Sequence, residues 1–523
     1  MSSDTTKSAQ FLHPVLSSEQ SKAFEQGLFK GDERLEWKAM NQAGGAIAKQ
    51  ALLDIRESIG DQALLKILVL VGKGHNGGDA VIATRHLLNK FPEASVDLVF
   101  PYGLGHLRPL VQRSLDDLQV AHGTRLQFLS LRKAAVPTQL ENFLGQDPID
   151  LCLDGLLGMQ FLPPVRSPAK ELIEWVNQRK DLGCRIAVDV PSGVGDRSDD
   201  QPFRADFSYA TGIAKAGLFE MNSRPFVGRI RYLDLGFFAG ASVDTNRSVV
   251  SDDVLGFRRV LRRSNVHKKT FGHVFVVGGS GTMPGAILMT VQAALKSGVG
   301  LVTAFVPEAI VAEAAAKIPD AMWVGLPQIP EDGGLALEGL GRIRELSSRA
   351  TGWVFGPGMG RHPETGTLVD EALSLSDAPV LLDADALLAS VFDGRWKNRA
   401  CVITPHLGEF NRLNDRPLNE PVEESMVEEF ANTHQCTVLL KGSPTLVTDG
   451  SCLAYSCFGG PVLARGGSGD ILSGLIGGRT AIPDTNTFPA VLEGAAWHGW
   501  AADRLAREQG QSSAKATDIL SFL

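Results

Sequence analysis

The sequence predicts two α/β domains, each built on a largely parallel β-sheet. Short runs of valine, isoleucine and leucine alternate with amphipathic segments along most of the 523 residues. Such apolar runs are typical of buried parallel strands joined by right-handed helical crossovers. The length also fits three domains of ordinary size, but a polar and then basic stretch interrupts the pattern only near residues 240–255. We therefore predict domains at residues 1–245 and 246–523.

The predicted elements follow this alternation in both halves. In the first half, strands are expected at residues 65–71, 95–100, 149–154, 185–190 and 229–235, with helices at residues 80–91 and 169–180. In the second half, strands are expected at residues 273–279, 300–307, 379–385, 400–405 and 437–442.

Composition excludes several classes of protein. The net charge is −8, so nucleic acid and anionic membranes are not expected partners. No apolar run reaches the roughly 18 residues of a membrane span, and the first ten residues do not resemble a signal peptide. Six cysteines without a C-x-x-C pair favour free thiols in a reducing compartment. We expect a cytoplasmic protein.

The first glycine-rich loop lies between a predicted strand and a predicted helix. Residues 72–77 (GKGHNG) match G-x-G-x-x-G, with Asp97 near the spacing expected for a ribose contact. This pattern predicts a Rossmann-like dinucleotide site, although a strand–helix turn can need glycine without any ligand. Asn76 and Asp79 add oxygen donors that suit a hard cation or a sugar hydroxyl.

Two further acidic residues end predicted strands. Asp154 ends the strand at residues 149–154, and Asp189 lies at the end of the strand at residues 185–190. An aspartate at a strand end is often a helix N-cap. In an open parallel sheet, however, ligands bind at the carboxyl ends of the strands. Both residues are therefore site candidates.

The first half resembles a known family. Met40–Gly44, GKGHNGGDA, LDGLLG and VDVPSG, spread over residues 15–236, resemble the NAD(P)HX epimerase domain of bifunctional NAD(P)H-hydrate repair enzymes. The resemblance implies that the hydrated dinucleotide contacts His75, Asn76, Gly77, Gly78, Asp79, Gly158 and Asp189. It implies that Asn76, Asp154 and Ser192 surround a K⁺ ion, with Asp154 also the acid/base residue.

The second half carries a glycine–aspartate turn, Arg465–Asp470 (RGGSGD), ahead of an apolar helix. Backbone amides that curl around one point at a helix N-terminus form an anion hole. The adjacent Asp470 suits a base that takes a proton from a hydroxyl attacking a phosphoryl group, unless it is only a loop cap. The turn resembles that of ribokinase-like kinases, which implies this same division of roles.

Additional motifs narrow the second resemblance. Residues 355–361 (FGPGMGR), 381–388 (LLDADALL), 404–410 (TPHLGEF), 440–447 (LKGSPTLV) and 516–520 (ATDIL) together resemble the ADP-dependent NAD(P)HX dehydratase domain, which has a ribokinase-like α/β fold. That family implies contacts of Ala286, Gly358, His406 and Asp470 with the hydrated dinucleotide. It implies that ADP with Mg²⁺ is held by Lys441, Gly442, Ser443, Pro444, Thr445, Gly466, Gly467, Ser468 and Gly469.

The two resemblances imply one function: repair of hydrated NADH and NADPH. The first half would interconvert the R and S epimers, and the second would dehydrate the S epimer, converting ADP to AMP and phosphate. The main alternative is a ribokinase-like small-molecule kinase with a non-catalytic dinucleotide-binding or interaction module at its N-terminus. It stays open because His75, Met159 and Gln160 depart from the epimerase pattern. The resemblance also implies a homo-oligomer.

Overall fold

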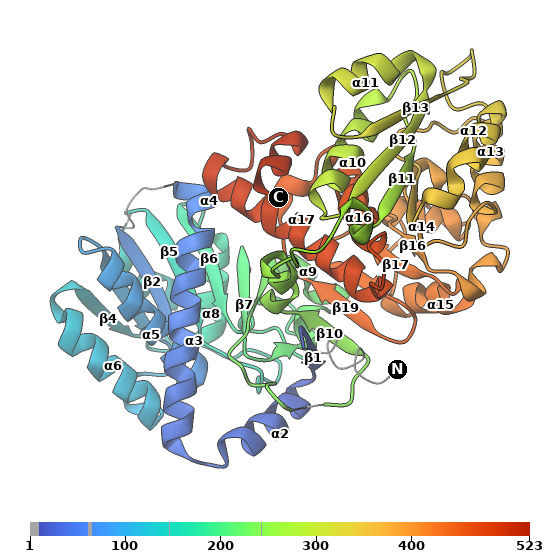
Figure 1. The fold of residues 1–523 in the computed structure, drawn as a ribbon. Helices are drawn as coiled ribbons and strands as arrows, with labels where there is room; N and C mark the ends of the chain where they lie inside the picture. Colours follow the sequence, from blue (N-terminus) through green and yellow to red (C-terminus); the bar gives the residue numbers. More distant parts are fainter. Residues whose placement is uncertain (1–9, 61–64, 146, 242) are drawn as a thin grey trace. The chain divides into compact units, whose positions relative to one another are not determined.

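The structure is a computed structural model that describes residues 10–60, 65–145, 147–241 and 243–523. The chain divides into two compact units, drawn as ribbons in Figure 1. The N-terminal unit comprises His13–Thr245 and Arg507–Gly510. The C-terminal unit comprises Asn246–Ala506, Gln511–Leu523 and the described part of Met1–Leu12.

Within the described residues, the N-terminal unit contains a seven-stranded sheet in which every pairing is parallel. The strand order is β4-β3-β2-β5-β6-β7-β9. The bounds are β2 (Lys66–Val71), β3 (Ser95–Phe100), β4 (Leu126–Ser130), β5 (Ile149–Gly155), β6 (Leu182–Val188), β7 (Phe207–Thr211) and β9 (Arg229–Leu233). The order changes direction between β2 and β5, and ligands of open α/β sheets bind at such a point.

Helices cover both faces of this sheet. One face carries α3 (Glu33–Asp54), α5 (His75–Lys90) and α6 (Pro109–His122), and the other carries α7 (Val136–Leu144) and α8 (Ala169–Gln178) (Figure 1). Side chains of β2 alternate between the two cores: Ile67 and Val69 pack toward α3 and α5, whereas Leu68 and Leu70 pack toward α7 and α8. The unit is therefore a three-layer sandwich.

The remaining elements of the N-terminal unit lie outside this sheet. They are β1 (Leu12–Leu16), which pairs with β8 (Ala214–Lys215), and the helices α2 (Ser18–Phe29), α4 (Arg56–Ile59) and α9 (Arg224–Val227). Helix α2 begins with a capping box in which the Ser17 hydroxyl accepts from Gln20 N and Gln20 Oε1 accepts from Ser17 N. This cap fixes where α2 begins.

The C-terminal unit is built on a larger sheet with the order β13-β12-β11-β14-β15-β16-β17-β18-β19-β10. The bounds are β10 (Arg247–Val250), β11 (His273–Val277), β12 (Leu301–Pro307), β13 (Met322–Leu326), β14 (Gly352–Phe355), β15 (Val380–Leu382), β16 (Cys401–Ile403), β17 (Thr437–Leu440), β18 (Thr445–Thr448) and β19 (Leu453–Ser456). Strands β13 to β17 are parallel, and the order changes direction between β11 and β14.

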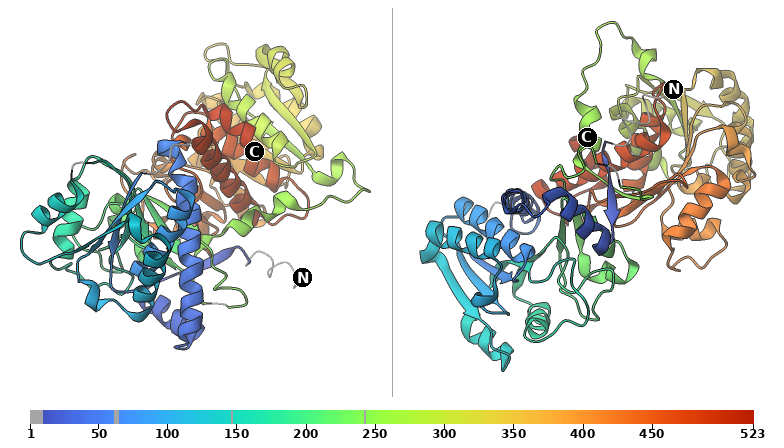
Figure 2. Two further views of the ribbon diagram at one scale, coloured as in Figure 1. Left: turned by 90° about the vertical axis from the view of Figure 1, so that its left-hand side faces the viewer. Right: turned by 90° about the horizontal axis from the view of Figure 1, so that it is seen from below.

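Helices α10 (Pro284–Lys296), α16 (Ser468–Thr480) and α17 (Thr487–Gln509) pack on one face of that sheet. Figure 2 shows α16 and α17, in red, beside the strands of this unit. Gly474 lets α16 approach α10, because a Cβ at that position would lie 2.1 Å from the carbonyl oxygen of Thr290. The other helices are α11 (Val311–Lys317), α12 (Leu340–Leu346), α13 (Pro363–Leu373), α14 (Leu407–Leu413) and α15 (Glu424–His434).

The predicted fold class is confirmed: a Rossmann-like three-layer unit is followed by a ribokinase-like α/β unit. The prediction of parallel strands does not hold for β18, which pairs antiparallel with both β17 and β19. Only residues 441–444 separate β17 from β18, and a connection this short permits a hairpin but no crossover helix. Among the described residues, no helix has both the length and the apolarity that crossing a bilayer requires.

Candidate functional sites

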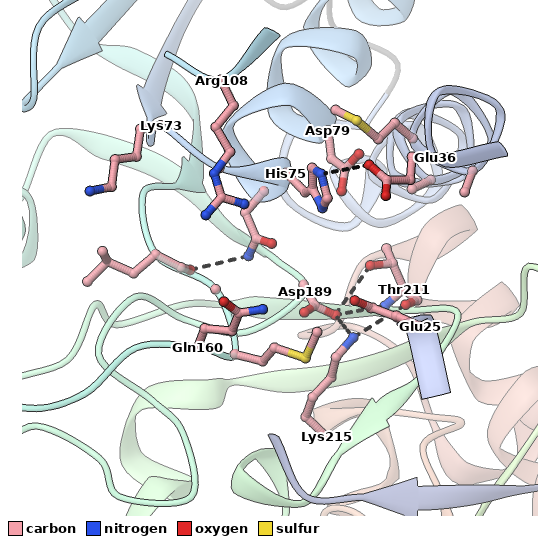
Figure 3. A pocket seen from close by; sticks show the side chains of 18 of the residues that line it. Glu25, Glu36, Lys73, His75, Asp79, Arg108, Gln160, Asp189, Thr211 and Lys215 are labelled. Carbon is pink, nitrogen blue, oxygen red and sulfur yellow. Dashed lines mark hydrogen bonds and ion pairs between the residues drawn. The ribbon is translucent and has the colours of Figure 1, made fainter. Parts of the chain in front are cut away.

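A cavity of about 410 Å³ lies in the N-terminal unit where the sheet order changes direction. Segments following β2, β3, β5, β6 and β9 form much of its wall, and residues of α2, α3, β7 and β8 supply the rest (Figure 3). Five of the residues expected to bind the dinucleotide line it: His75, Asn76, Asp79, Gly158 and Asp189. The other two, Gly77 and Gly78, are buried in the first turn of α5.

The loop after β2 contacts the loop after β5 at the base of this cavity. A Cβ on Gly72 would lie 2.0 Å from the carbonyl oxygen of Leu156, and the Gly72 amide donates to Gly155 O at 3.0 Å. A side chain cannot fit in that space without separating the two loops. Glycine at position 72 is therefore required by packing as well as by any ligand.

Basic side chains gather at one side of the cavity. Lys73 and Arg108 lie together there in Figure 3, and the Lys73 ammonium is 5.6 Å from the centre of the Tyr102 ring. His75 Nε2 is 3.7 Å from Glu36 Oε2. Burial lowers the pKa of His75, Glu36 raises it and Arg108 lowers it further. Two cations beside the N-terminus of α5 form a place suited to phosphate oxygens.

A buried ion pair lies on the other side of the cavity. The Lys215 ammonium is 2.5 Å from Asp189 Oδ1, which also accepts from the amide and the hydroxyl of Thr211 at 3.3 Å each (Figure 3). The side chains of Lys215 and Asp189 are 5% and 7% exposed. Asp189 also adopts a left-handed backbone conformation, with φ of 69°. Such costly features concentrate at functional sites.

Two carboxyl groups near this pair have raised pKa values. Burial raises the pKa of Glu25 to about 7; Lys215 opposes the shift, whereas Asp189 and Glu36 add to it. Burial also raises the pKa of Asp79 well above its ordinary value, with Asp189 adding to the effect. Asp79 Oδ1 is buried and has no hydrogen-bond partner among the described residues. Near neutral pH the Glu25 carboxyl can therefore carry a proton.

Asp154 has no exposed surface and is not among the residues that line the cavity. Its Oδ1 accepts from Ser192 Oγ at 2.6 Å and from Leu156 N at 3.2 Å, and its Oδ2 accepts from Ser192 N at 2.7 Å. Burial raises the pKa of Asp154 to about 6 despite these hydrogen bonds, which lower it. Asp154 itself does not line the cavity, although Leu156, whose amide donates to it, does.

Asn76 and Ser192 are tied to the same cluster as Asp154. Asn76 Nδ2 donates to the carbonyl oxygens of Val188 at 3.0 Å and Leu157 at 3.2 Å, and Ser192 Oγ accepts from Leu157 N at 2.9 Å. The Asp154 carboxylate and the Ser192 hydroxyl are thus in contact, and Asn76 joins them through the Leu157 segment. Because hard cations are held by oxygen ligands, these residues fit the K⁺ ion that the epimerase resemblance implies.

In the C-terminal unit, Asp470 occupies the first turn of α16. Gly467 precedes the helix with φ of 93°, and the Ser468 amide is already used in a hydrogen bond to Arg465 O at 3.3 Å. The Gly469 and Asp470 amides belong to the turn whose N–H groups have no acceptor within a helix. Burial raises the pKa of Asp470 to about 6; Asp383 adds to the shift and Lys441 opposes it.

Lys441 connects the turn after β17 to the start of α16. Its ammonium is 3.0 Å from Asp383 Oδ1 and 3.6 Å from Glu409 Oε2, and a Cβ on Gly469 would lie 3.4 Å from it. Burial lowers the pKa of Lys441, but Asp383 and Glu409 outweigh it, so the net shift is upward. Lys441 therefore stays charged beside the amides of α16.

The other predicted residues of this unit fall into separate groups. Gly358 has φ of 64°, and a Cβ on it would lie 2.9 Å from the Cβ of Ala286, so these two are neighbours where the sheet order changes direction. His406 caps α14: its Nδ1 accepts from Glu409 N, and Glu409 Oε2 accepts from His406 N. His406 and Glu409 thus form a capping box at the start of α14.

The segment expected to hold the nucleotide forms the turn between β17 and β18, with a cis peptide at Ser443–Pro444. Thr445 Oγ1 donates to Gly442 O at 3.2 Å within this turn. Of these five residues, Lys441 lies next to Gly469. Gly466 and Gly467 directly precede α16, and Ser468 is its first residue.

Three residues that sequence reasoning missed lie at the centres of these sites. Asp383 directly follows β15, so the strand-end rule that identified Asp154 and Asp189 could also have found it. Lys215 in β8 and Glu25 in α2 carry no local sequence signal, because one basic or acidic residue in an amphipathic chain is ordinary.

Comparison with known proteins covers both units. Residues 274–523 match the family model described as NAD(P)H-hydrate dehydratase, and residues 37–217 match the one described as YjeF-related protein N-terminus. The chain also resembles a solved ADP/ATP-dependent NAD(P)H-hydrate dehydratase from Bacillus subtilis, co-crystallised with ATP/Mg²⁺. The identity is 27%, over 50% of this chain and 91% of that one, with a TM-score of 0.45.

Curated relatives span nearly the whole chain. The bifunctional NAD(P)H-hydrate repair enzyme Nnr of Moorella thermoacetica is 32% identical over 498 residues, which cover 91% of each chain. The enzyme of the same name from Coxiella burnetii is 29% identical over 503 residues, 93% of this chain and 94% of that one. Because both halves match in one relative, the alternative of a small-molecule kinase with a non-catalytic N-terminal module is not favoured. The chain belongs to the family of bifunctional NAD(P)H-hydrate repair enzymes.

Proposed function

We propose that the N-terminal unit interconverts the R and S epimers of hydrated NADH and NADPH, and that the C-terminal unit dehydrates the S epimer with ADP. The observation that carries the dehydratase assignment is the placement of Asp470 in the first turn of α16, next to Gly469 and the Lys441–Asp383 pair. A proton acceptor, a cation and helix amides at one point are the groups that phosphoryl transfer to a hydroxyl requires.

In this proposal, the hydroxyl oxygen of the hydrated ring attacks the β-phosphorus of ADP and AMP leaves. Asp470 takes the hydroxyl proton, and its raised pKa keeps it a stronger base than an exposed aspartate. Lys441 and the amides of Gly469 and Asp470 face the negative charge that develops. Phosphate then leaves the ring carbon, and loss of a proton from the neighbouring carbon restores the double bond. Phosphate is a far better leaving group than hydroxide.

The cations of both sites belong to this proposal. Mg²⁺ would enter with the nucleotide and would neutralise charge on its phosphates. K⁺ at Asn76, Asp154 and Ser192 would compensate the carboxylate of Asp154, which is buried without a cationic side chain among its hydrogen-bond partners. The glycine loop, with His75 and Asp79, would bind the dinucleotide. A homo-oligomer and a cytoplasmic location remain predictions, which light scattering and cell fractionation test.

One experiment tests both halves. Mixed epimers of hydrated NADH are supplied with ADP and Mg²⁺, and the return of NADH absorbance and the release of phosphate are followed. We expect complete conversion, with one phosphate per NADH. Conversion that stops when the S epimer is used up would contradict the epimerase half. A stable phosphorylated product without NADH would instead indicate a kinase.

The variant Asp470→Asn should abolish the return of NADH, because the amide cannot accept the hydroxyl proton. The matched control is Asp253→Asn, a change of the same chemistry at an exposed position of the C-terminal unit. Full activity of the Asp470 variant would contradict the base assignment.

A further inference from the structure

The cavity of the N-terminal unit has two chemically different ends. Lys73 and Arg108 lie at one end, and Glu25, Asp189 and Lys215 lie at the other (Figure 3). The hydrated dinucleotide is itself two-ended, because its pyrophosphate is anionic and its hydrated ring is not. Charge complementarity therefore places the pyrophosphate beside Lys73, Arg108 and the N-terminus of α5, and directs the ring toward Glu25 and Lys215.

The chemistry of the hydrated ring determines which catalytic groups are needed at the end of the cavity that contains Glu25 and Lys215. Water adds to the dihydropyridine with its hydroxyl on the carbon next to the ring nitrogen, which makes a hemiaminal. A hemiaminal changes configuration by opening: the hydroxyl loses its proton, the carbon–oxygen double bond forms, and the carbon–nitrogen bond breaks as the nitrogen gains a proton. Closing onto the other face reverses these transfers. One proton acceptor and one proton donor are needed side by side.

Asp154 does not meet this requirement in the structure. It has no exposed surface, it does not line the cavity, and both of its oxygens accept hydrogen bonds from Ser192 or Leu156. By contrast, Glu25 and Lys215 both line the cavity. The Glu25 carboxyl has no hydrogen-bond partner among the described residues, so it is available to a ligand.

We propose that Glu25 and Lys215 are the proton-transfer pair of the epimerase half, with Asp189 positioning Lys215. This inference rests on the proposed epimerase function and deepens it. On opening, the Glu25 carboxylate takes the proton of the ring hydroxyl, and the Lys215 ammonium gives a proton to the ring nitrogen as its bond to carbon breaks. After the aldehyde turns, the nitrogen attacks its other face, Lys215 recovers its proton and Glu25 returns the other to oxygen. No other reactant is consumed.

The surroundings of Glu25 support this role. The charged groups that face it are Lys215 of β8, Asp189 after β6, Glu36 of α3 and Asp79 of α5. Their combined effect with burial raises the pKa of Glu25 to about 7, so both of its protonation states are populated near neutral pH. The carboxylate is the form that starts ring opening. Epimerisation should therefore slow as the pH falls below about 7.

Glu25 also lies outside the part of the chain that the family models match. It belongs to α2, ahead of the matched residues 37–217. The Ser17 capping box sets the start of α2, and Phe29 of the same helix lines the cavity with Glu25.

The test follows epimerisation alone, by separating the two epimers of hydrated NADH chromatographically after incubation of pure S epimer without ADP. We expect Glu25→Gln and Lys215→Met to lower the rate by about 100-fold or more, the range in which a general acid or base acts. Glu25→Gln should also remove the decline of the rate below pH 7. Glu25→Asp should restore part of the rate and the pH dependence.

The matched control is Glu19→Gln, an exposed residue of the same helix that should leave epimerisation unchanged. Thermal unfolding and the affinity for hydrated NADH report whether a variant is folded and still binds. A Glu25→Gln variant that binds and keeps the wild-type rate and pH profile would overturn the inference. Wild-type protein that binds but does not epimerise would overturn the proposed epimerase function instead.

Discussion

The ammonium of Lys441 lies 3.0 Å from Asp383 Oδ1, and the other oxygen of Asp383 accepts the hydroxyl of Ser473 at 2.5 Å. Asp383 follows β15, Lys441 follows β17, and Ser473 lies on α16. The side chain of Asp383 is 2% exposed. One buried carboxylate therefore fixes the cation of the proposed phosphoryl-transfer site relative to the helix that carries Asp470.

The first prediction concerns this carboxylate. Asp383→Asn should lower kcat/KM of dehydration by about 10- to 100-fold, because misplacing a catalytic group by a fraction of a bond length is costly. The measurement is NADH formation from pure S epimer with saturating ADP. Asp377→Asn, an exposed aspartate of the same unit, is the control. Unchanged kinetics in the Asp383 variant would show that Lys441 is positioned without it.

The second prediction concerns the pH dependence of dehydration. Asp470 acts only when ionised, and its pKa is raised to about 6, so kcat/KM should decline as the pH falls through 6. The carboxylate of Asp383 raises the pKa of Asp470, so Asp383→Asn should move this decline to lower pH. The measurement is a pH profile of kcat/KM for both proteins. A shift to higher pH would contradict the assignment.

The third prediction concerns the contact between the two loops of the N-terminal unit. Gly72→Ala places a Cβ about 2.0 Å from the carbonyl oxygen of Leu156, so the loops must separate. We expect the free energy of unfolding of this unit to fall by about 2 kcal/mol or more. Denaturant unfolding measures it. Gly123→Ala, where a Cβ would meet nothing within 4 Å, should change stability little; equal effects would refute the packing argument.

The fourth prediction concerns potassium. If Asn76, Asp154 and Ser192 hold K⁺, the Tm of the N-terminal unit should rise in potassium chloride relative to choline chloride at equal ionic strength. Asp154→Asn should abolish this difference, because the buried negative charge is gone. The comparison is made by calorimetry at several salt concentrations. A Tm that rises equally in both salts would point to general screening, without a specific ion site.

The sequence predicts some strands of the two sheets better than others. Long apolar runs such as those of β2 and β12 identify buried central strands. Strand β4 is partly exposed and its sequence, LQFLS, contains polar residues, so it does not show a continuous apolar run. The antiparallel pairing of β18 depends on the length of a turn, which an apolar-run criterion does not weigh.

The same contrast holds for the sites. Glycine loops and strand-end aspartates are local signals, and they led to His75, Asn76, Asp189 and Asp470. Lys215 becomes notable only because folding brings it within 2.5 Å of Asp189. Likewise, the burial of Asp154 depends on Ser192, 38 residues away in the chain, and no local pattern reports it.

Helix α2 supplies the part of the cavity wall that contains Glu25. This helix lies outside the parallel sheet whose strand β2 leads into the glycine loop. Substitutions in α2 can therefore alter the reactivity of this cavity while the sheet core and the dinucleotide loop stay intact. Among related chains, affinity for the dinucleotide and turnover can then evolve independently. A conserved glycine loop by itself would therefore indicate affinity for the dinucleotide but would not indicate turnover.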